Sequence, residues 1–228
     1  RRIRQAIGYA IGRDKIIQNL FYGAAVPATG LLPPYHWAYE RDVMKISHDA
    51  ERAKRILEAA GYRDPDGDGP QRRFWLTLKI SMNEFRRVLA SVMQSDLESV
   101  GIGVKVRSCE WSTFFSDINR GNFQLCMLMW VGENDPDLYR EIFSSNGARN
   151  RGKYRDPQID EWVEKARVAV TEEEQKYYYS MVQKKVAEDC PYISLWYESN
   201  MALMRKELGG LRLTPDVSTR VLKDVYWN

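Results

Sequence analysis

The chain has 228 residues, of which 44% are hydrophobic and 29% are charged, a composition that is ordinary for a globular protein and excludes a disordered chain. This length is enough for one large domain or two small ones. The 34 basic and 31 acidic residues leave a formal net charge of +3, which is too small and too scattered to indicate a nucleic-acid partner. The longest apolar stretch, residues 123–131, is far shorter than the ~20 residues of a membrane-spanning helix, so no transmembrane segment is predicted.

The first residues of the chain have the periodicity of an α-helix. Apolar residues recur there at spacings of three and four, which predicts one buried helix face: Ile3, Ala6, Ile7, Ala10 and Ile11. A second short helix is expected to begin at an Asp14 cap and to end at Gly23. Residues 24–47 hold prolines and aromatic residues and are predicted to form a long loop, typical of a functional or interface segment. Asp49 is expected to cap the next helix, and Gly61 to end it.

Strands and helices alternate in the middle of the chain. Residues 74–80, 104–107 and 123–130 are predicted strands, and residues 83–100 and 112–119 are the predicted helices between them. The third strand is apolar nearly throughout, as expected of a strand that is covered on both faces. This pattern predicts an α/β fold with helices packed on a sheet.

The last third of the chain is predominantly helical. A short helix is predicted up to Phe143, followed by a polar loop over residues 144–156. Two longer helices are predicted over residues 157–170 and 171–189. Residues 193–197 are then predicted to form a strand that leaves the domain.

Signatures of catalysis are absent from the sequence. It contains no common nucleophile, zinc or nucleotide motif, and His36 and His48 are not spaced as metal ligands. Cys109, Cys126 and Cys190 lack CxxC spacing and are interpreted as buried thiols. No catalytic residue, metal or cofactor is therefore predicted.

One acidic segment imitates half of a calcium loop. Asp64, Asp66 and Asp68 have the spacing of the first half of an EF-hand loop, but its twelfth position, which requires Glu, is Trp75. A strand is also predicted to follow, where an EF-hand requires a helix. A solvated turn is therefore favoured over a calcium site.

Aromatic and acidic side chains follow the predicted third strand. Trp130 ends that strand, and Glu133 and Asp135 lie in the next loop. Ligands of α/β sheets bind at the carboxyl ends of the strands. A carboxylate there would pair with a ligand ammonium group while Trp130 covers an apolar part of the ligand. Two alternatives stay open: an ordinary acidic turn before the next helix, and a carboxylate pair that performs glycosidase acid/base chemistry.

Motifs along the chain occur in the order found in one protein family. The longest are residues 4–14 (RQAIGYAIGRD) and 48–62 (HDAERAKRILEAAGY). The shorter ones are residues 94–97, 100–104, 110–111 and 121–123, then Asn150, Tyr154, Asp160 and residues 189–191. Each motif alone is weak, but the ordered set is specific. On these residues the chain resembles the C-terminal half of the family 5 extracellular solute-binding proteins of ABC transporters, the peptide/nickel-binding group.

The resemblance implies a fold of two lobes that enclose the ligand between them. Residues 1–195 would form the second, C-terminal lobe, an α/β unit of the periplasmic-binding-protein type with a sheet covered by helices. Residues 196–228 would return through the hinge toward a first lobe that is largely missing. We therefore expect the chain to be a fragment of a longer protein.

The function implied by the resemblance is solute reception without catalysis. The expected protein delivers peptides, or similar small solutes, to the permease of an ABC importer. It is expected in the periplasm or lipid-anchored on the outer face of the cell membrane. Its expected partners are the solute, the permease and the missing first lobe. Two alternatives stay open: an oligosaccharide-binding member of the same family, and the ligand-sensing domain of a transcription regulator.

The resemblance also implies ligand-binding positions. Peptide-binding members place an Asp shortly after the strand-ending Trp to hold the α-ammonium group of the peptide. Here Trp130 is followed by Glu133, which keeps the negative charge, and then by Asp135. The candidate ligand-binding residues are Trp130, Glu133, Asp135, Trp111, Asn150 and Tyr154.

Overall fold

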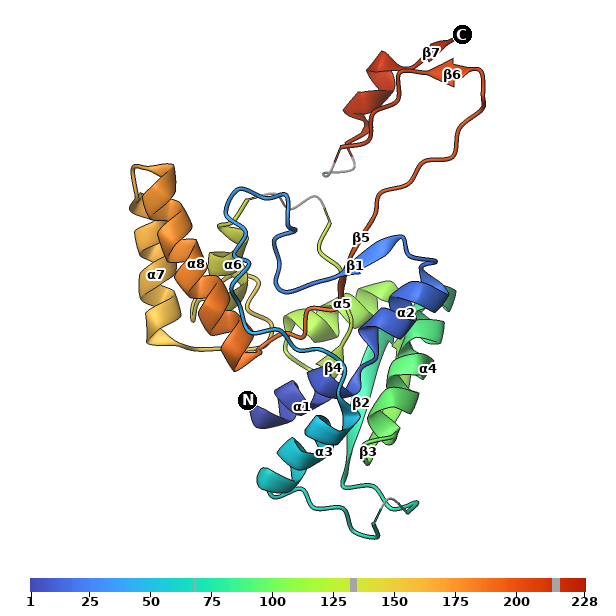
Figure 1. Ribbon diagram of the computed structural model, residues 1–228, viewed down its shortest axis with the longest axis vertical. Coiled ribbons are helices and arrows are strands. Elements are labelled where there is room, and N and C mark those ends of the chain that lie inside the picture. The colour runs from blue at the N-terminus through green and yellow to red at the C-terminus, as the bar shows by residue number, and fades with distance from the viewer. Residues whose placement is uncertain (68, 132–134, 215–217) are drawn as a thin grey trace.

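The computed structural model describes residues 1–67, 69–131, 135–214 and 218–228 (Figure 1). The helices are α1 (Arg2–Ala10), α2 (Arg13–Leu20), α3 (Ala50–Ala59), α4 (Glu84–Glu98), α5 (Trp111–Asn119), α6 (Leu138–Phe143), α7 (Pro157–Val168), α8 (Glu172–Asp189) and the 3-10 helix η1 (Thr219–Asp224). The strands are β1 (Ala25–Pro27), β2 (Phe74–Ser81), β3 (Ile102–Cys109), β4 (Leu125–Cys126), β5 (Trp196–Glu198), β6 (Leu208–Gly209) and β7 (Tyr226–Trp227).

A parallel sheet of order β3-β2-β4 forms the centre of the α/β unit. β2 and β3 pair along their full lengths, from Phe74 opposite Ile102 to Ser81 opposite Cys109. β4 lies on the other side of β2 and runs parallel to it. Because the strands are parallel, their carboxyl ends meet at one edge of the sheet.

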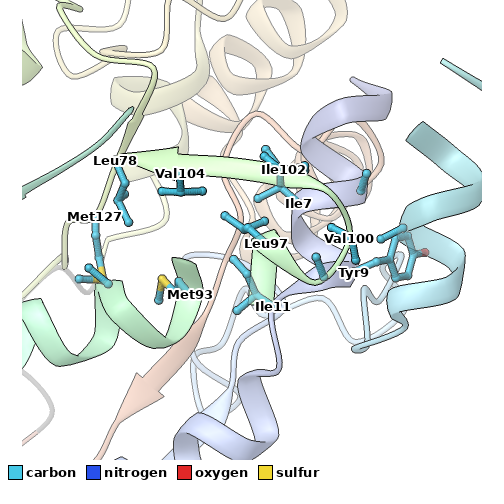
Figure 2. Packing of buried hydrophobic residues seen from close by; sticks show 14 of the residues in the cluster. Ile7, Tyr9, Ile11, Leu78, Met93, Leu97, Val100, Ile102, Val104 and Met127 are labelled. Atoms are coloured by element: carbon cyan, nitrogen blue, oxygen red, sulfur yellow. The ribbon is translucent and has the colours of Figure 1, made fainter. Parts of the chain in front are cut away.

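The sheet buries its two faces differently. Alternate residues of β2 and β3 join the main core with α1, α3 and α4. Figure 2 shows Leu78, Ile102 and Val104 of the sheet beside Met93 and Leu97 of α4. On the opposite face, the side chain of Lys79 reaches α5. Its Nζ lies 2.8 Å from Asp117 Oδ2 and also donates to the carbonyl of Asn122, which satisfies this buried charge.

A second core lies among α6, α7 and α8, where α7 and α8 run side by side (Figure 1). Leu32 and Ala38 of the predicted long loop pack into this core. Tyr139 of α6 is fully buried, and its hydroxyl accepts a hydrogen bond of 3.1 Å from the Leu31 amide. The 24–47 segment is therefore held against the helical unit.

An antiparallel pair, β1 with β5, joins distant parts of the chain, with Val26 opposite Tyr197. β1 lies inside the segment predicted to be loop, and β5 is displaced from the predicted 193–197 strand toward the C-terminus. Arg13 supports this junction because its guanidinium donates to the carbonyls of Ala28 (2.9 Å), Ser194 (2.7 Å) and Ile46. Three carbonyl acceptors compensate the burial of this cation.

Beyond β5 the chain forms an arm, defined here as residues 200–214 and 218–228. β6 and β7 pair antiparallel within it. Figure 1 shows the arm, coloured orange to red, extending away from the sheet and the other helices. Its exposed apolar residues are Met201, Leu203, Met204, Leu213, Leu222, Tyr226 and Trp227.

Two local expectations were wrong. β4 covers only Leu125–Cys126 of the predicted 123–130 strand. The carbonyl of Met127 lies 3.4 Å from Nη1 of Arg86 instead of continuing the ladder. The register, with Leu78 opposite Leu125, would also carry residues beyond 128 past the end of β2 at Ser81. The second helix is capped by Gly12, with Asp14 inside its first turn.

The caps of the longer helices follow the expected chemistry. The Asp49 side chain accepts from the Arg52 amide at the start of α3, and the Asn83 side chain accepts from the Arg86 amide at the start of α4. Thr171 accepts from the Glu174 amide at the start of α8. Each cap satisfies a backbone donor that the helix itself leaves unpaired.

Candidate ligand-binding site

The carboxyl edge of the parallel sheet exposes large apolar side chains. Met82 follows β2, Trp111 comes two residues after β3, and Met129 follows β4. Their exposed fractions are 67%, 51% and 50%. Exposed apolar side chains gathered at one edge indicate a surface that another molecule covers.

Trp111 is placed by the cap of α5. The Glu110 carboxylate accepts from the amides of Ser112 (2.8 Å) and Thr113 (3.3 Å), which fixes the start of the helix. A hydrogen bond from the Ser112 hydroxyl lowers the pKa of Glu110, so this cap is ionised at neutral pH. Trp111 is the first helical residue, and its ring stacks on Phe115 one turn later, with ring centroids 5.5 Å apart and planes 21° apart.

Trp130 lies against two arginines from the loop between α6 and α7. The guanidinium carbons of Arg149 and Arg151 lie 5.5 and 5.2 Å from the centroid of the Trp130 ring, within the range of cation–π attraction. Arg151 also lies 5.1 Å from the centroid of the Phe115 ring. These contacts make one continuous surface, which we call the aromatic–arginine band: Trp111, Phe115, Trp130, Arg149 and Arg151.

Asn150 holds the loop that carries both arginines. Its Nδ2 donates to the carbonyls of Ser144 (2.9 Å) and Tyr154 (2.6 Å), and its Oδ1 accepts from the Tyr154 amide (2.9 Å). The Tyr154 hydroxyl donates to Asp189 Oδ2 at 2.8 Å, and burial together with that carboxylate raises the pKa of Tyr154. The polar groups of both predicted residues therefore bond within the protein and support the loop.

Of the two acidic candidates after Trp130, the structure describes only Asp135. Asp135 is exposed, and its Oδ1 accepts from the Asp137 amide at 2.9 Å, which forms a turn before α6. Glu133, the predicted partner of a ligand ammonium group, lies outside the described residues. Of the predicted site residues, the structure thus brings Trp111 and Trp130 into one band. Asn150 holds the loop that carries the two arginines of this band.

Three members of the band, Phe115, Arg149 and Arg151, were missed by the sequence analysis. Phe115 lies on a short helix that also buries Phe114, so its exposure could not be separated from core packing. The arginines lie in a polar loop without periodicity. Their one available signal was their position on either side of Asn150, a residue of a matched motif.

The acidic turn near residue 64 forms internal contacts. Asp64 Oδ2 lies 3.2 Å from Arg73 Nη2, and Asp66 Oδ2 accepts from the Gln71 amide at 2.9 Å. Asp68 lies outside the described residues. Within residues 1–67, 69–131, 135–214 and 218–228, no three His, Cys, Asp or Glu side chains are grouped to hold a metal ion. In the same part of the chain, every helix is too short or too polar to cross a membrane.

The chain is similar to known binding proteins over most of its length. Residues 1–151 match the family described as bacterial extracellular solute-binding proteins, family 5 Middle. The chain is 30% identical over 227 residues to the oligopeptide-binding protein AppA of Bacillus subtilis. It is 29% identical over 220 residues to the probable di/tripeptide-binding protein 5 of Pseudomonas aeruginosa. Both alignments cover 94% of this chain but only 42% and 40% of the relatives, so the chain spans about two-fifths of their length.

Solved structures support the same relationship. The structure of Bacillus subtilis AppA in complex with a nonapeptide superposes with a TM-score of 0.88 at 28% identity, covering 100% of this chain and 47% of that chain. NikZ of Campylobacter jejuni with Ni(L-His) superposes with a TM-score of 0.81 at 23% identity, which supports the fold alone; that match covers 98% of this chain and 48% of NikZ. The expected α/β fold and the expected family are confirmed. The chain belongs to the family 5 bacterial extracellular solute-binding proteins, which bind solutes and are not enzymes.

Proposed function

We propose that this chain is the ligand-binding lobe of an extracytoplasmic receptor that binds peptides and delivers them to the permease of an ABC importer. The observation that carries the proposal is the aromatic–arginine band, in which Trp111 and Phe115 are exposed and Trp130, Arg149 and Arg151 are half-buried. Aromatic faces suit the apolar side chains of a peptide, and guanidinium groups suit its carbonyl and carboxylate oxygens. The relatives named for oligopeptides and di/tripeptides support this solute class.

The domain arrangement is part of the proposal. Residues 1–195 form the second lobe, and residues 196–228 return through the hinge to a first lobe. The exposed apolar side chains of the arm, Leu203 and Trp227 among them, support this arrangement because such groups are normally covered. The two-fifths coverage of the relatives agrees with one lobe of a larger protein.

Glu133 remains the proposed partner of the peptide α-ammonium group, with Asp135 as the neighbouring acid. Trp130 would cover the first apolar side chain beside them. We also propose a periplasmic or lipid-anchored location and a permease partner. DppA of Helicobacter pylori with the peptide STSA, which is described as an ABC transporter-associated periplasmic binding protein, supports the periplasmic location and the transporter partner.

Native mass spectrometry of the full-length protein tests the solute class. A heterogeneous set of released short peptides is the expected result. A released sugar would replace this proposal with the oligosaccharide-binding alternative, and the exposed Trp111–Phe115 stack would then be the sugar platform.

A matched pair of tryptophan variants tests the site. Trp111 and Trp75 are 51% and 54% exposed, but Trp75 lies near the amino end of β2, about 20 Å along the strand from its carboxyl end. Trp111→Ala is expected to weaken peptide binding about 3- to 10-fold, the range of one aromatic stacking contact. Trp75→Ala is expected to leave the affinity unchanged. Equal effects of the two variants in titration calorimetry would contradict this placement.

A further inference from the structure

We infer that Arg151 binds a carboxylate group of the solute, an inference that rests on the proposed peptide-binding function. The two sources of such a group are the C-terminal α-carboxylate and an Asp or Glu side chain.

The guanidinium of Arg151 is fixed on three sides. Phe115 and Trp130 lie 5.1 and 5.2 Å from its central carbon, and its Nε donates to Asn119 Oδ1 at 2.9 Å. The two ring contacts and the hydrogen bond at Nε together restrict the rotation of this side chain. The arginine is thus ordered before any solute arrives, which lowers the entropic cost of binding.

The outer edge of this guanidinium has no partner among the residues that the structure describes. Within the described residues, Nη1 and Nη2 of Arg151 make no hydrogen bond or ion pair. Several other arginines use their terminal nitrogens within the protein: Arg73 pairs with Glu58 and Asp64, and Arg140 pairs with Asp137. Arg13 directs its terminal nitrogens to backbone carbonyls. Arg151 is therefore held in place with two parallel donors left open.

A carboxylate is the group that fits these donors. Two N–H groups on one guanidinium edge match the two oxygens of a carboxylate and form a bidentate, charge-assisted pair. Arg149 lies over the same Trp130 ring and adds positive charge to the site, while its Nε, 2.9 Å from Glu141, keeps it in place. Arg151 belongs to the band beside the carboxyl edge of the sheet, so a carboxylate bound to Arg151 would lie where the solute is proposed to bind.

The experiment uses the full-length protein and alanine peptides of two to nine residues. Each peptide is titrated calorimetrically as the free acid and as the C-terminal amide, and a second amide series carries one internal Glu. The variant is Arg151→Met, which keeps an unbranched apolar stem between the rings but removes the charge. The matched control is Arg155→Met, the same change at an exposed position in the same loop.

The wild type is expected to bind one carboxylate-bearing series about 10- to 100-fold more tightly than the matching amides, the range of a charged hydrogen-bonded pair. Preference for free acids identifies the α-carboxylate, and preference for Glu-containing amides identifies the side chain. Arg151→Met is expected to abolish that preference, and Arg155→Met to keep it. A preference that survives in Arg151→Met, or that is absent in the wild type, overturns the inference alone. A wild type that binds no peptide overturns the proposed function and this inference with it.

Discussion

Replacing Asn150 with Ala separates a supporting role from direct solute contact. The change removes three hydrogen bonds of 2.6–2.9 Å that join Asn150 to Ser144 and Tyr154. At a net ~1 kcal/mol per bond, the loss is about 3 kcal/mol of unfolding free energy. Because the loop carries Arg149 and Arg151, solute affinity should fall as well, as a consequence of disorder in the band.

The assay combines urea unfolding of the full-length protein with amide hydrogen exchange. Asn150→Ala should lower the unfolding free energy and speed exchange at the Tyr154 amide, whose acceptor is removed. Asn146→Ala is the control, since Asn146 is exposed in the same loop and no hydrogen bond of its side chain is described. If Asn150→Ala weakened solute binding without changing exchange or stability, Asn150 would be a solute contact and the supporting role would be refuted.

Two further predictions concern the structure around the site. Gly101 has φ +83°, and a Cβ there would lie 2.8 Å from Nε of Arg73, so Gly101→Ala should destabilise the protein by at least about 1–2 kcal/mol in urea unfolding. Gly152→Ala, where a Cβ meets only ordinary contacts, should cost much less; equal costs would contradict this account. Burial raises the pKa of both Cys126 and Cys190 to about 11, so neither thiol should label with iodoacetamide at pH 8, and labelling should rise with pH toward that value. Peptide mapping that finds either thiol labelled at the rate of free cysteine at pH 8 would refute the burial.

Much of the helical structure follows from local sequence chemistry. Asp49 and Asn83 were recognisable as the residues before α3 and α4 because a short polar side chain precedes an apolar period of three and four. The strand β2 was recognisable from residues 74–80 because apolar and β-forming residues are concentrated between a turn cluster and a helix. These signals need only neighbouring residues, and the structure confirms them.

Strand boundaries that depend on pairing with a distant part of the chain could not be predicted from neighbouring residues. The apolar run after Phe123 has strand composition, yet pairing ends at Cys126 because a strand exists only as long as its neighbour provides acceptors and donors. β1 likewise exists through its pairing with β5, about 170 residues later in the chain. Hydropathy alone contains no information about where such a partner begins or ends.

The same distinction explains why the sequence indicated the edge of the site but missed its charged half. Trp130 was recognisable because it comes at the end of an apolar run, and any parallel sheet directs that end toward the ligand edge. Arg151 acquires its role from Phe115 and Asn119, which belong to a helix more than thirty positions earlier in the chain. A guanidinium in a polar loop is normally solvated and mobile, whereas one that contacts two rings and donates a hydrogen bond from Nε has less freedom left to lose when solute binds. The chemistry of this site thus depends on the tertiary contact that immobilises the arginine, so its selectivity should respond to changes in Phe115 and Asn119 even though Arg151 itself is unaltered.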